Sequence, residues 1–261
     1  MKVLWSRLAK RWLILAIIIA LIISFLQFIT LTKIPVEDSP YTRWLSIDSF
    51  NFAPIVFFIL LPIFSSLPAG IMLKEDYDSG LLYKWKLQKS IKQVLFNYIK
   101  IAFITGFIVT ALALSANLFS WFMILPNIKP DNLLNKNILV INFNTLFVSL
   151  YYTHPFIHAI LSIVFAAFWS GLFAIFVTVT SLWVKNKFAA ACSGLVLQIV
   201  LLLFNNLFKL PNLVSYAPAD FLHETAPTTN ISLPVTIIVT LLLMIYCSVM
   251  FYIDQKKLIN L

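Results

Sequence analysis

The chain has 261 residues, of which 61% are hydrophobic and 11% are charged, with a net charge of +9 and a mean hydropathy of +0.94. No compact soluble fold can bury so much apolar surface, so the composition excludes a soluble domain and predicts an integral membrane protein. The two cysteines, Cys192 and Cys247, lie inside apolar runs and lack Cys-x-x-Cys spacing. We therefore expect neither a disulfide nor a metal site from them.

Six apolar runs are long enough to span a membrane, since about 20 helical residues cross roughly 30 Å of hydrocarbon. We expect an all-α fold with a single transmembrane domain over residues 1–261 and spans at residues 12–31, 52–73, 101–122, 155–184, 188–208 and 233–252. The first run follows basic residues, as a signal peptide does, but it is longer and lacks a clear cleavage site, so we expect it to be retained. The longest outer connection, residues 123–154, contains an apolar run that predicts either a short interfacial helix or a strand.

The distribution of basic residues predicts the orientation of the chain. If the N-terminus is cytoplasmic, fourteen of the nineteen lysines and arginines fall on the inner face of the six-span chain. Cytoplasmic connections carry such an excess, so we expect a multi-pass protein of the cell membrane with both termini in the cytoplasm. The positive net charge then reports orientation, and we expect no nucleic-acid partner.

The connection at residues 74–100, between the second and third expected spans, carries six lysines and three acids. On a helix that starts near Leu82, five apolar side chains fall in one narrow stripe, namely Leu87, Ile91, Val94, Leu95 and Tyr98. The lysines fall on the other side, namely Lys86, Lys89, Lys92 and Lys100. Such an amphipathic helix suits a membrane interface or a docked cytoplasmic protein. The alternative is a basic loop that only fixes orientation.

Prolines and polar residues inside the expected spans mark candidate moving parts. Pro62 and Pro68 in the second span remove backbone hydrogen bonds, so each predicts a bend that is either a hinge or a static kink. Gln198 and Asn205 in the fifth span are seven residues apart and therefore share a helix face. They either line a translocation path or hold helices together through hydrogen bonds.

Residues for catalysis, metal binding or energy coupling are hard to find. The central parts of the spans contain no Asp, Glu, Lys or Arg, and the five glycines never give the phosphate-binding Gly-x-x-x-x-Gly-Lys spacing. His154 and His158 lack the glutamate of a zinc-protease helix, so we interpret them as interfacial histidines. Asp220, His223 and Glu224 lie in an expected outer loop, which we interpret as solvated. We expect no catalytic residue, no metal site and no cofactor bound by this chain.

Short motifs follow one order along the chain. Around the second span stand Pro40, Tyr41, Trp44 and Asp48, then Leu67, Pro68 and Ala69, then Glu75, Asp76, Asp78, Ser79 and Gly80 before the basic helix. Later come Lys185, Asn186 and Lys187, then Ala217, Pro218, Ala219 and Asp220. In this order the chain resembles the ABC-2 type permeases of bacterial ABC transporters, a six-span export class, and their short Gram-positive members in particular. It departs from them in lacking a proline, serine and arginine cluster within the basic helix, and in its short N-terminal segment, residues 1–10.

The resemblance implies that the basic segment contains a coupling helix that fits a cytoplasmic ATPase. The residues at this contact would be Glu75, Asp78, Gly80, Trp85, Leu87, Lys89, Ile91 and Lys92. Acids favour a helix N-terminus and glycine permits a sharp turn, which suits this arrangement. The resemblance also implies two ATPase copies that bind ATP and Mg, and a second permease, identical or related, in the bilayer.

The expected function is the permease subunit of an ATP-driven exporter that moves an amphipathic or hydrophobic substrate outward and hydrolyses nothing itself. A peptide, an antibiotic and a drug all remain open as the substrate. The alternative is a membrane scaffold or assembly protein without a transport path, for which charge-free spans are also adequate. An intramembrane enzyme would need convergent ionisable residues inside the spans, and it is the least favoured class.

Overall fold

The computed structural model describes residues 2–8, 10–30, 38–49, 51–88, 90–131, 140–141, 143–225 and 229–259 of the chain. These residues fold into helices, and the only β contact among them is an isolated bridge between Val214 and Asn230. The helices of the first half are α1 (Lys2–Arg7), α2 (Lys10–Phe25), η1 (Leu26–Thr30), α3 (Pro40–Arg43), α4 (Phe52–Ser66), α5 (Met72–Asp78), α6 (Leu81–Gln88) and α7 (Ile91–Ile124). Those of the second half are α9 (Val148–Thr153), α10 (Pro155–Thr180), η3 (Ser181–Trp183), α11 (Lys187–Leu207), η4 (Pro211–Leu213), α12 (Pro218–Leu222) and α13 (Leu233–Ile259).

Five helical stretches among the described residues are long and apolar enough to cross a membrane, namely Lys10–Ile29, Ile91–Ile124, Pro155–Trp183, Lys187–Leu207 and Leu233–Ile259. They correspond to the first, third, fourth, fifth and sixth expected spans. Their length and composition are those of a membrane-embedded protein. The prediction of an all-helical membrane protein is confirmed at this level.

The second expected span, residues 52–73, is not one continuous helix. α4 ends at Ser66, a turn occupies residues 67–71, and α5 follows. With 15 residues at 1.5 Å each, α4 is about 22 Å long, less than the thickness of a hydrocarbon core. Pro68 accounts for its end, because proline lacks the N–H that would continue the helical ladder and its ring clashes with the preceding turn. Pro62, in contrast, lies inside α4, and the helix continues past it.

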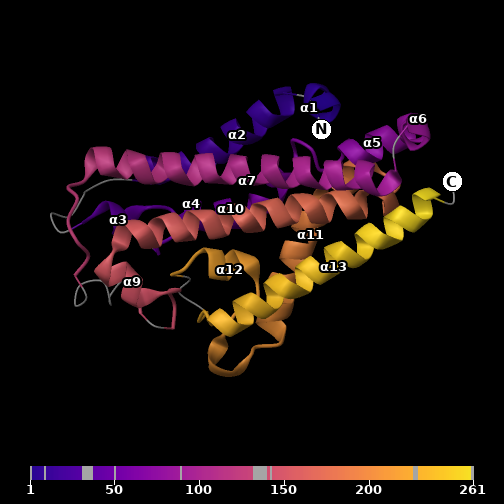
Figure 1. The fold of residues 1–261 in the computed structure, drawn as a ribbon. Helices are drawn as coiled ribbons and strands as arrows, with labels where there is room; N and C mark the ends of the chain where they lie inside the picture. Colours follow the sequence, from indigo (N-terminus) through magenta and orange to yellow (C-terminus); the bar gives the residue numbers. More distant parts are fainter. Residues whose placement is uncertain are drawn as a thin grey trace.

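The long helices run between two ends of the molecule (Figure 1). We call one of them the basic end, because it combines α1, α5, α6, the η3–α11 turn and the end of α13 with Arg7, Lys74, Lys84, Lys86, Lys185, Lys187, Lys256 and Lys257. The opposite end, here called the polar end, contains α3, α9 and α12. Both described chain ends therefore lie at the basic end.

The core has a large part that extends to the polar end and a smaller part at the basic end. The large part is built around aromatic side chains that are almost fully buried, among them Trp44, Trp121, Trp169 and Phe57. In the smaller part, Leu4 of α1 and the following Leu8 join a cluster with Leu73, Leu82, Ile91 and Leu258. Residues near both termini and from α5, α6 and α7 therefore share one packed unit.

The axis of the molecule is the pair α7 and α10, which lie side by side over most of their length (Figure 1). They approach each other closely at Gly106, where an added Cβ would lie 3.0 Å from the Ser170 carbonyl oxygen and 3.1 Å from the Ala174 Cβ. Glycine leaves room for the Ser170 hydroxyl to donate a hydrogen bond of 2.8 Å to the Gly106 carbonyl. Small residues and hydroxyl groups at such contacts are the usual means by which membrane helices associate.

Candidate functional site

The expected coupling segment consists of two short helices and the start of α7. α5 and α6 are separated by Gly80, whose φ of +73° is the left-handed conformation that glycine adopts without strain. Ser90 has an extended backbone at the N-cap of α7, so the single amphipathic helix expected from Leu82 onward is interrupted there. The Ser90 side chain makes no capping hydrogen bond, and the Ser90 carbonyl accepts the first backbone bonds of α7, from Gln93 and Val94.

This interruption divides the expected apolar stripe. Four of its members, Ile91, Val94, Leu95 and Tyr98, are buried in the core of the basic end. Leu87, on α6, is 88% exposed. The prediction that these five side chains form one stripe on a continuous helix is therefore wrong, and Ile91, expected at the ATPase contact, belongs to the interior of the protein.

A buried carboxylate attaches α5 to its neighbours. The Asp76 oxygens accept hydrogen bonds of 2.6 and 2.5 Å from the two terminal nitrogens of Arg7, on α1. Asp76 also accepts a hydrogen bond from the Tyr98 hydroxyl on α7. This hydrogen bonding to Asp76 raises the pKa of Arg7, which keeps the guanidinium charged. Trp85 of α6 is half-buried, stacks on Tyr98 and lies under the Arg7 guanidinium.

Three further predicted contact residues, Glu75, Asp78 and Lys92, lie at the surface. Glu75 and Lys92 are exposed, and Asp78 forms an ion pair of 3.0 Å with Lys74 one turn earlier in α5. Lys89 lies outside the described residues. The segment therefore has a packed inner side, at Asp76 and Trp85, and an exposed outer side, at Leu87.

Pro68 and Pro62, the predicted hinge positions, are both buried. Pro68 lies in the turn between α4 and α5, where Gly70 N–H donates a hydrogen bond of 2.7 Å to the Ser66 carbonyl. Pro62 packs against α11, because a Cβ added to Gly194 would lie 3.1 Å from the Pro62 Cβ. Pro68 therefore lies in the turn between two consecutive helices, and Pro62 lies at the contact between α4 and α11.

Gln198 and Asn205 are both buried on the inner face of α11, as expected from their spacing. Gln198 Nε2 donates a hydrogen bond of 3.3 Å to the Phe58 carbonyl on α4. Asn205 contacts the polar end, with Nδ2 donating to Asp220 at 3.4 Å and Oδ1 accepting from the Tyr216 N–H at 3.3 Å. In this structure both side chains connect helices and loops, which is the second of the two expected uses.

A buried polar cluster at the polar end differs from the sequence interpretation. His223 and Glu224, expected in a solvated loop, are each 3% exposed, and His158, expected at an interface, is 2% exposed. Burial lowers the pKa of His223 to about 4, and its Nε2 lies 3.2 Å from the Asp48 carbonyl. The flanking Phe221 and Leu222 are also buried, and they are the sequence signal that this loop folds inward.

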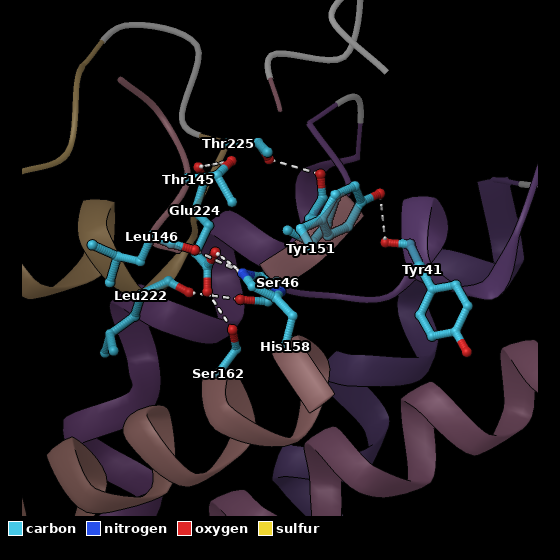
Figure 2. A network of polar contacts seen from close by, with 11 residues as sticks. Tyr41, Ser46, Thr145, Leu146, Tyr151, His158, Ser162, Leu222, Glu224 and Thr225 are labelled. Atoms are coloured by element: carbon cyan, nitrogen blue, oxygen red, sulfur yellow. Dashed lines mark hydrogen bonds and ion pairs between the residues drawn. The ribbon is translucent and has the colours of Figure 1, made fainter. Parts of the chain in front are cut away.

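Glu224 is the centre of this cluster (Figure 2). Its Oε1 accepts a hydrogen bond from the Ser162 hydroxyl on α10, and its backbone N–H donates to the Ser46 carbonyl at 3.1 Å. The Ser46 hydroxyl in turn donates to the Leu222 carbonyl at 2.9 Å. The loops before α4 and after α12 are thereby joined to α10.

Two apolar grooves flank α13. The first, of about 490 Å³, lies between α10 and α13 and has His158, Ser162 and Glu224 among its lining residues. The second, of about 710 Å³, lies between α10, α11 and α13 and is lined by apolar and aromatic side chains such as Trp169, Phe173 and Tyr246. Among the described residues no group of three or more His, Cys, Asp or Glu side chains is arranged to hold a metal ion.

Comparisons of the chain with protein-family models, with curated proteins and with solved structures gave no match. Function is therefore inferred from the residues and their geometry.

Proposed function

We propose that this chain is the membrane-spanning permease subunit of an ATP-binding-cassette exporter. It crosses the membrane six times with both termini in the cytoplasm, and it pairs with a second permease, identical or related. Two copies of a cytoplasmic ATPase bind and hydrolyse ATP with Mg, and this chain has no ATP site of its own. The cargo is an amphipathic or hydrophobic molecule that moves outward.

The observation that carries this proposal is the outward surface of α6 at the basic end. Leu87 is 88% exposed and Tyr83 is 46% exposed, and both lie among exposed lysines. Two exposed apolar side chains among lysines, on a segment whose other side is packed, offer a surface on which another protein can dock. The surface suits an ATPase that presents an apolar pocket with acidic residues at its rim.

The packing beneath α6 supports the transmission of force from such a partner to the membrane helices. The stack of Trp85 on Tyr98 joins α6 to the first turns of α7, and Asp76 joins α5 to the same tyrosine. α7 then extends for 34 residues, about 50 Å, to the polar end. A displacement of α6 is thereby passed to the longest helix of the described chain.

The combination of α4, the turn at residues 67–71 and α5 supports a sixth crossing. α4 begins at Phe52 near the polar end, and α5 packs with the basic-end core. A helix of about 22 Å followed by a buried turn crosses a membrane when neighbouring helices surround it. Ala53, Phe57 and Leu61 of α4 are each at most 1% exposed, which satisfies that condition.

The test is co-purification of the chain, in nanodiscs, with the ATPase encoded in its gene neighbourhood. Leu87→Glu introduces a charge on the α6 surface and is expected to abolish the complex and the ATP hydrolysis that depends on it. Gln93→Glu is the matched control, because Gln93 is exposed at the basic end on the first turn of α7. This control is expected to retain the complex.

If the wild-type chain binds no such ATPase, the exporter proposal is overturned and a membrane scaffold without a transport path becomes the better reading. If the complex forms and both variants keep it, the docking surface lies elsewhere than α6. A substitution at Ile91 would not discriminate, because that side chain is in the core and its loss destabilises the protein itself.

A further inference from the structure

The groove between α10 and α13 is apolar along most of its length and polar at one end. Phe107, Leu161, Phe165, Phe168 and Leu241 are among its apolar lining residues. Glu224, Ser162, His158, Thr236 and Thr240 supply the polar groups. Its volume of about 490 Å³ is in the range of small-molecule sites, which are commonly apolar clefts with a few placed polar groups.

The carboxylate of Glu224 is only partly satisfied by the protein. Its Oε1 accepts from the Ser162 hydroxyl, whereas Oε2 accepts no hydrogen bond from any residue that the structure describes. His158 Nε2 lies 3.2 Å from this Oε2, but the same nitrogen lies 2.8 Å from the Leu146 carbonyl. Since a carbonyl oxygen only accepts, the Nε2 hydrogen is directed to Leu146, and Oε2 is left for another donor.

The other hydroxyl groups of the groove also offer acceptors. Thr236 donates its hydroxyl hydrogen to the Ser232 carbonyl at 3.0 Å, and Thr240 donates to the Thr236 carbonyl at 2.7 Å. Their oxygens therefore remain as acceptors toward the groove. None of the described lining residues is a lysine or an arginine, and His158 pairs with Glu224 only when its ring is protonated. A buried carboxylate without a full set of donors is costly, and a bound cation with N–H groups removes that cost.

We propose that this groove binds a single-chain amphipathic amine, with its ammonium group at Glu224 and its apolar chain between α10 and α13. A primary ammonium carries three N–H donors and a positive charge, so it complements a site that offers a carboxylate and hydroxyl acceptors. The alkyl chain fills the part of the groove lined by Phe165, Phe168 and Leu241. This inference rests on the proposed export function for its role as a cargo site, and it names the class of that cargo.

The direction of the groove matches the way an amphiphile lies in a bilayer. Its polar groups are near the starts of α10 and α13, at the polar end, and its apolar residues continue along both helices toward the middle of the molecule. A molecule whose head lies at the interface places its chain toward the bilayer centre in the same sense. A cargo in the outer leaflet therefore fits the groove without turning over.

The experiment measures equilibrium binding of radiolabelled dodecylamine to the purified chain in phosphatidylcholine nanodiscs, with empty nanodiscs subtracted. We expect saturable binding that unlabelled dodecylamine displaces. Dodecanol, dodecanoate and dodecyltrimethylammonium are expected to displace it at least about tenfold less well, because they lack either the charge or the N–H donors. Equal displacement by dodecanol and dodecylamine would overturn the proposal.

Variants separate the polar and apolar parts of the site. Glu224→Gln is expected to weaken dodecylamine binding by about tenfold or more. Leu241→Trp fills the groove from α13 at a position that is 51% exposed, so it is expected to abolish binding without harming the fold. Ile245→Trp is the matched control, because Ile245 is 58% exposed on α13 and lines neither groove.

If Glu224→Gln does not fold, Leu241→Trp compared with Ile245→Trp decides the matter, and unchanged binding in Leu241→Trp rejects the site. Nanodiscs that contain phosphatidylethanolamine provide a further arm. If that lipid displaces dodecylamine completely, the groove is a lipid site and the assignment to cargo is overturned. The assay contains no ATPase, so loss of the α6 complex and loss of amine binding are separate results.

Discussion

The buried side chain of His223, at the polar end, makes the stability of the fold depend on pH. His223 is 3% exposed, and its ring stacks on Phe58 of α4. Its Nε2 donates to the Asp48 carbonyl, since that oxygen only accepts. Burial opposes a positive charge on the ring, so the folded protein keeps it neutral at pH values where an exposed histidine is protonated.

We predict that the protein loses stability as the pH falls from about 6.5 to about 4. The pKa of His223 is about 4 in the folded state and near 6.5 when unfolded, so the unfolded state binds more protons in this window. Stability therefore falls with falling pH and changes no further through His223 below about 4. The full effect is on the order of 3 kcal/mol. The measurement is the thermal unfolding midpoint in detergent between pH 4 and 8.

The His223→Gln variant isolates this contribution, because glutamine retains an N–H donor and does not titrate. Its unfolding midpoint should vary less with pH than that of the wild type. His154→Gln is the control, since His154 is exposed and should leave the profile unchanged. A His223→Gln profile that follows the wild type at every pH would contradict the prediction.

At the scale of elements, the hydropathy of the sequence was sufficient to predict five of the long helices. Continuous apolar runs correspond to α2, α7, α10, α11 and α13, because each such helix satisfies its own backbone and needs no partner to form. At Pro68 the sequence predicted a bend within one span, whereas the structure has a helix boundary at residues 67–71, and the interruption at Ser90 was not predicted. The first coincides with a single proline, whose effect is local and does not appear in a hydropathy average. The second lies at Ser90, whose side chain makes no capping hydrogen bond that would mark it.

The candidate site was predicted in part for a similar reason. The charge contrast of residues 74–100 marked a segment that contains α6, most of α5 and the first turns of α7 in the structure, and its role in coupling stays a prediction. It did not distinguish the exposed Leu87 from the buried Ile91, because that difference depends on where the helix is interrupted. The Glu224 cluster was missed because its partners, Ser46, His158 and Ser162, are distant in sequence and are brought together only by tertiary packing.

Asp76 is predicted to be the residue that holds α5 against α1 and α7. Replacement by Asn removes the charge that faces Arg7 and places an amide donor among donors, which we expect to cost about 2 kcal/mol of stability. The value is moderate because the Arg7 side chain is 38% exposed and regains water. Denaturant unfolding in detergent measures the change, and hydrogen exchange in residues 2–8 should accelerate as α1 detaches.

The same substitution at Asp78 provides the comparison. The Asp78 side chain is 33% exposed and pairs with Lys74 on its own helix, so Asp78→Asn should change stability by less than about 0.5 kcal/mol. Equal losses in the two variants would show that Asp76 has no special role in the attachment of α5.

At the scale of the whole molecule, the two ends have different chemical characters that suit two different surroundings. The basic end combines exposed lysines with the short helices α5 and α6, and both described chain ends lie there (Figure 1). The polar end encloses Glu224, His223 and His158 within its packed structure. A partner that docks at the basic end and a ligand in the α10–α13 groove would therefore act on opposite ends of the same helices.

We predict that the basic end faces the cytoplasm. Single cysteines introduced at exposed positions test this in a chain whose Cys192 and Cys247 are replaced by alanine. A membrane-impermeant maleimide should label Asn127→Cys and Lys209→Cys in intact cells. It should label the basic-end variants only after the cells are opened, namely Lys10→Cys, Lys84→Cys and Lys187→Cys. Permeabilised cells provide the control that every site is reactive.

The pair Lys10→Cys and Lys84→Cys also decides the number of crossings. Between these positions lie α2, which is long enough to cross, and the shorter α4 with its turn. Because the number of crossings between two sites on one side must be even, protection of both in intact cells requires that α4 cross together with α2. Labelling of Lys84→Cys but not Lys10→Cys in intact cells would instead show that α2 crosses the membrane and that α4 does not. The basic segment would then face outward, beyond the reach of a cytoplasmic ATPase.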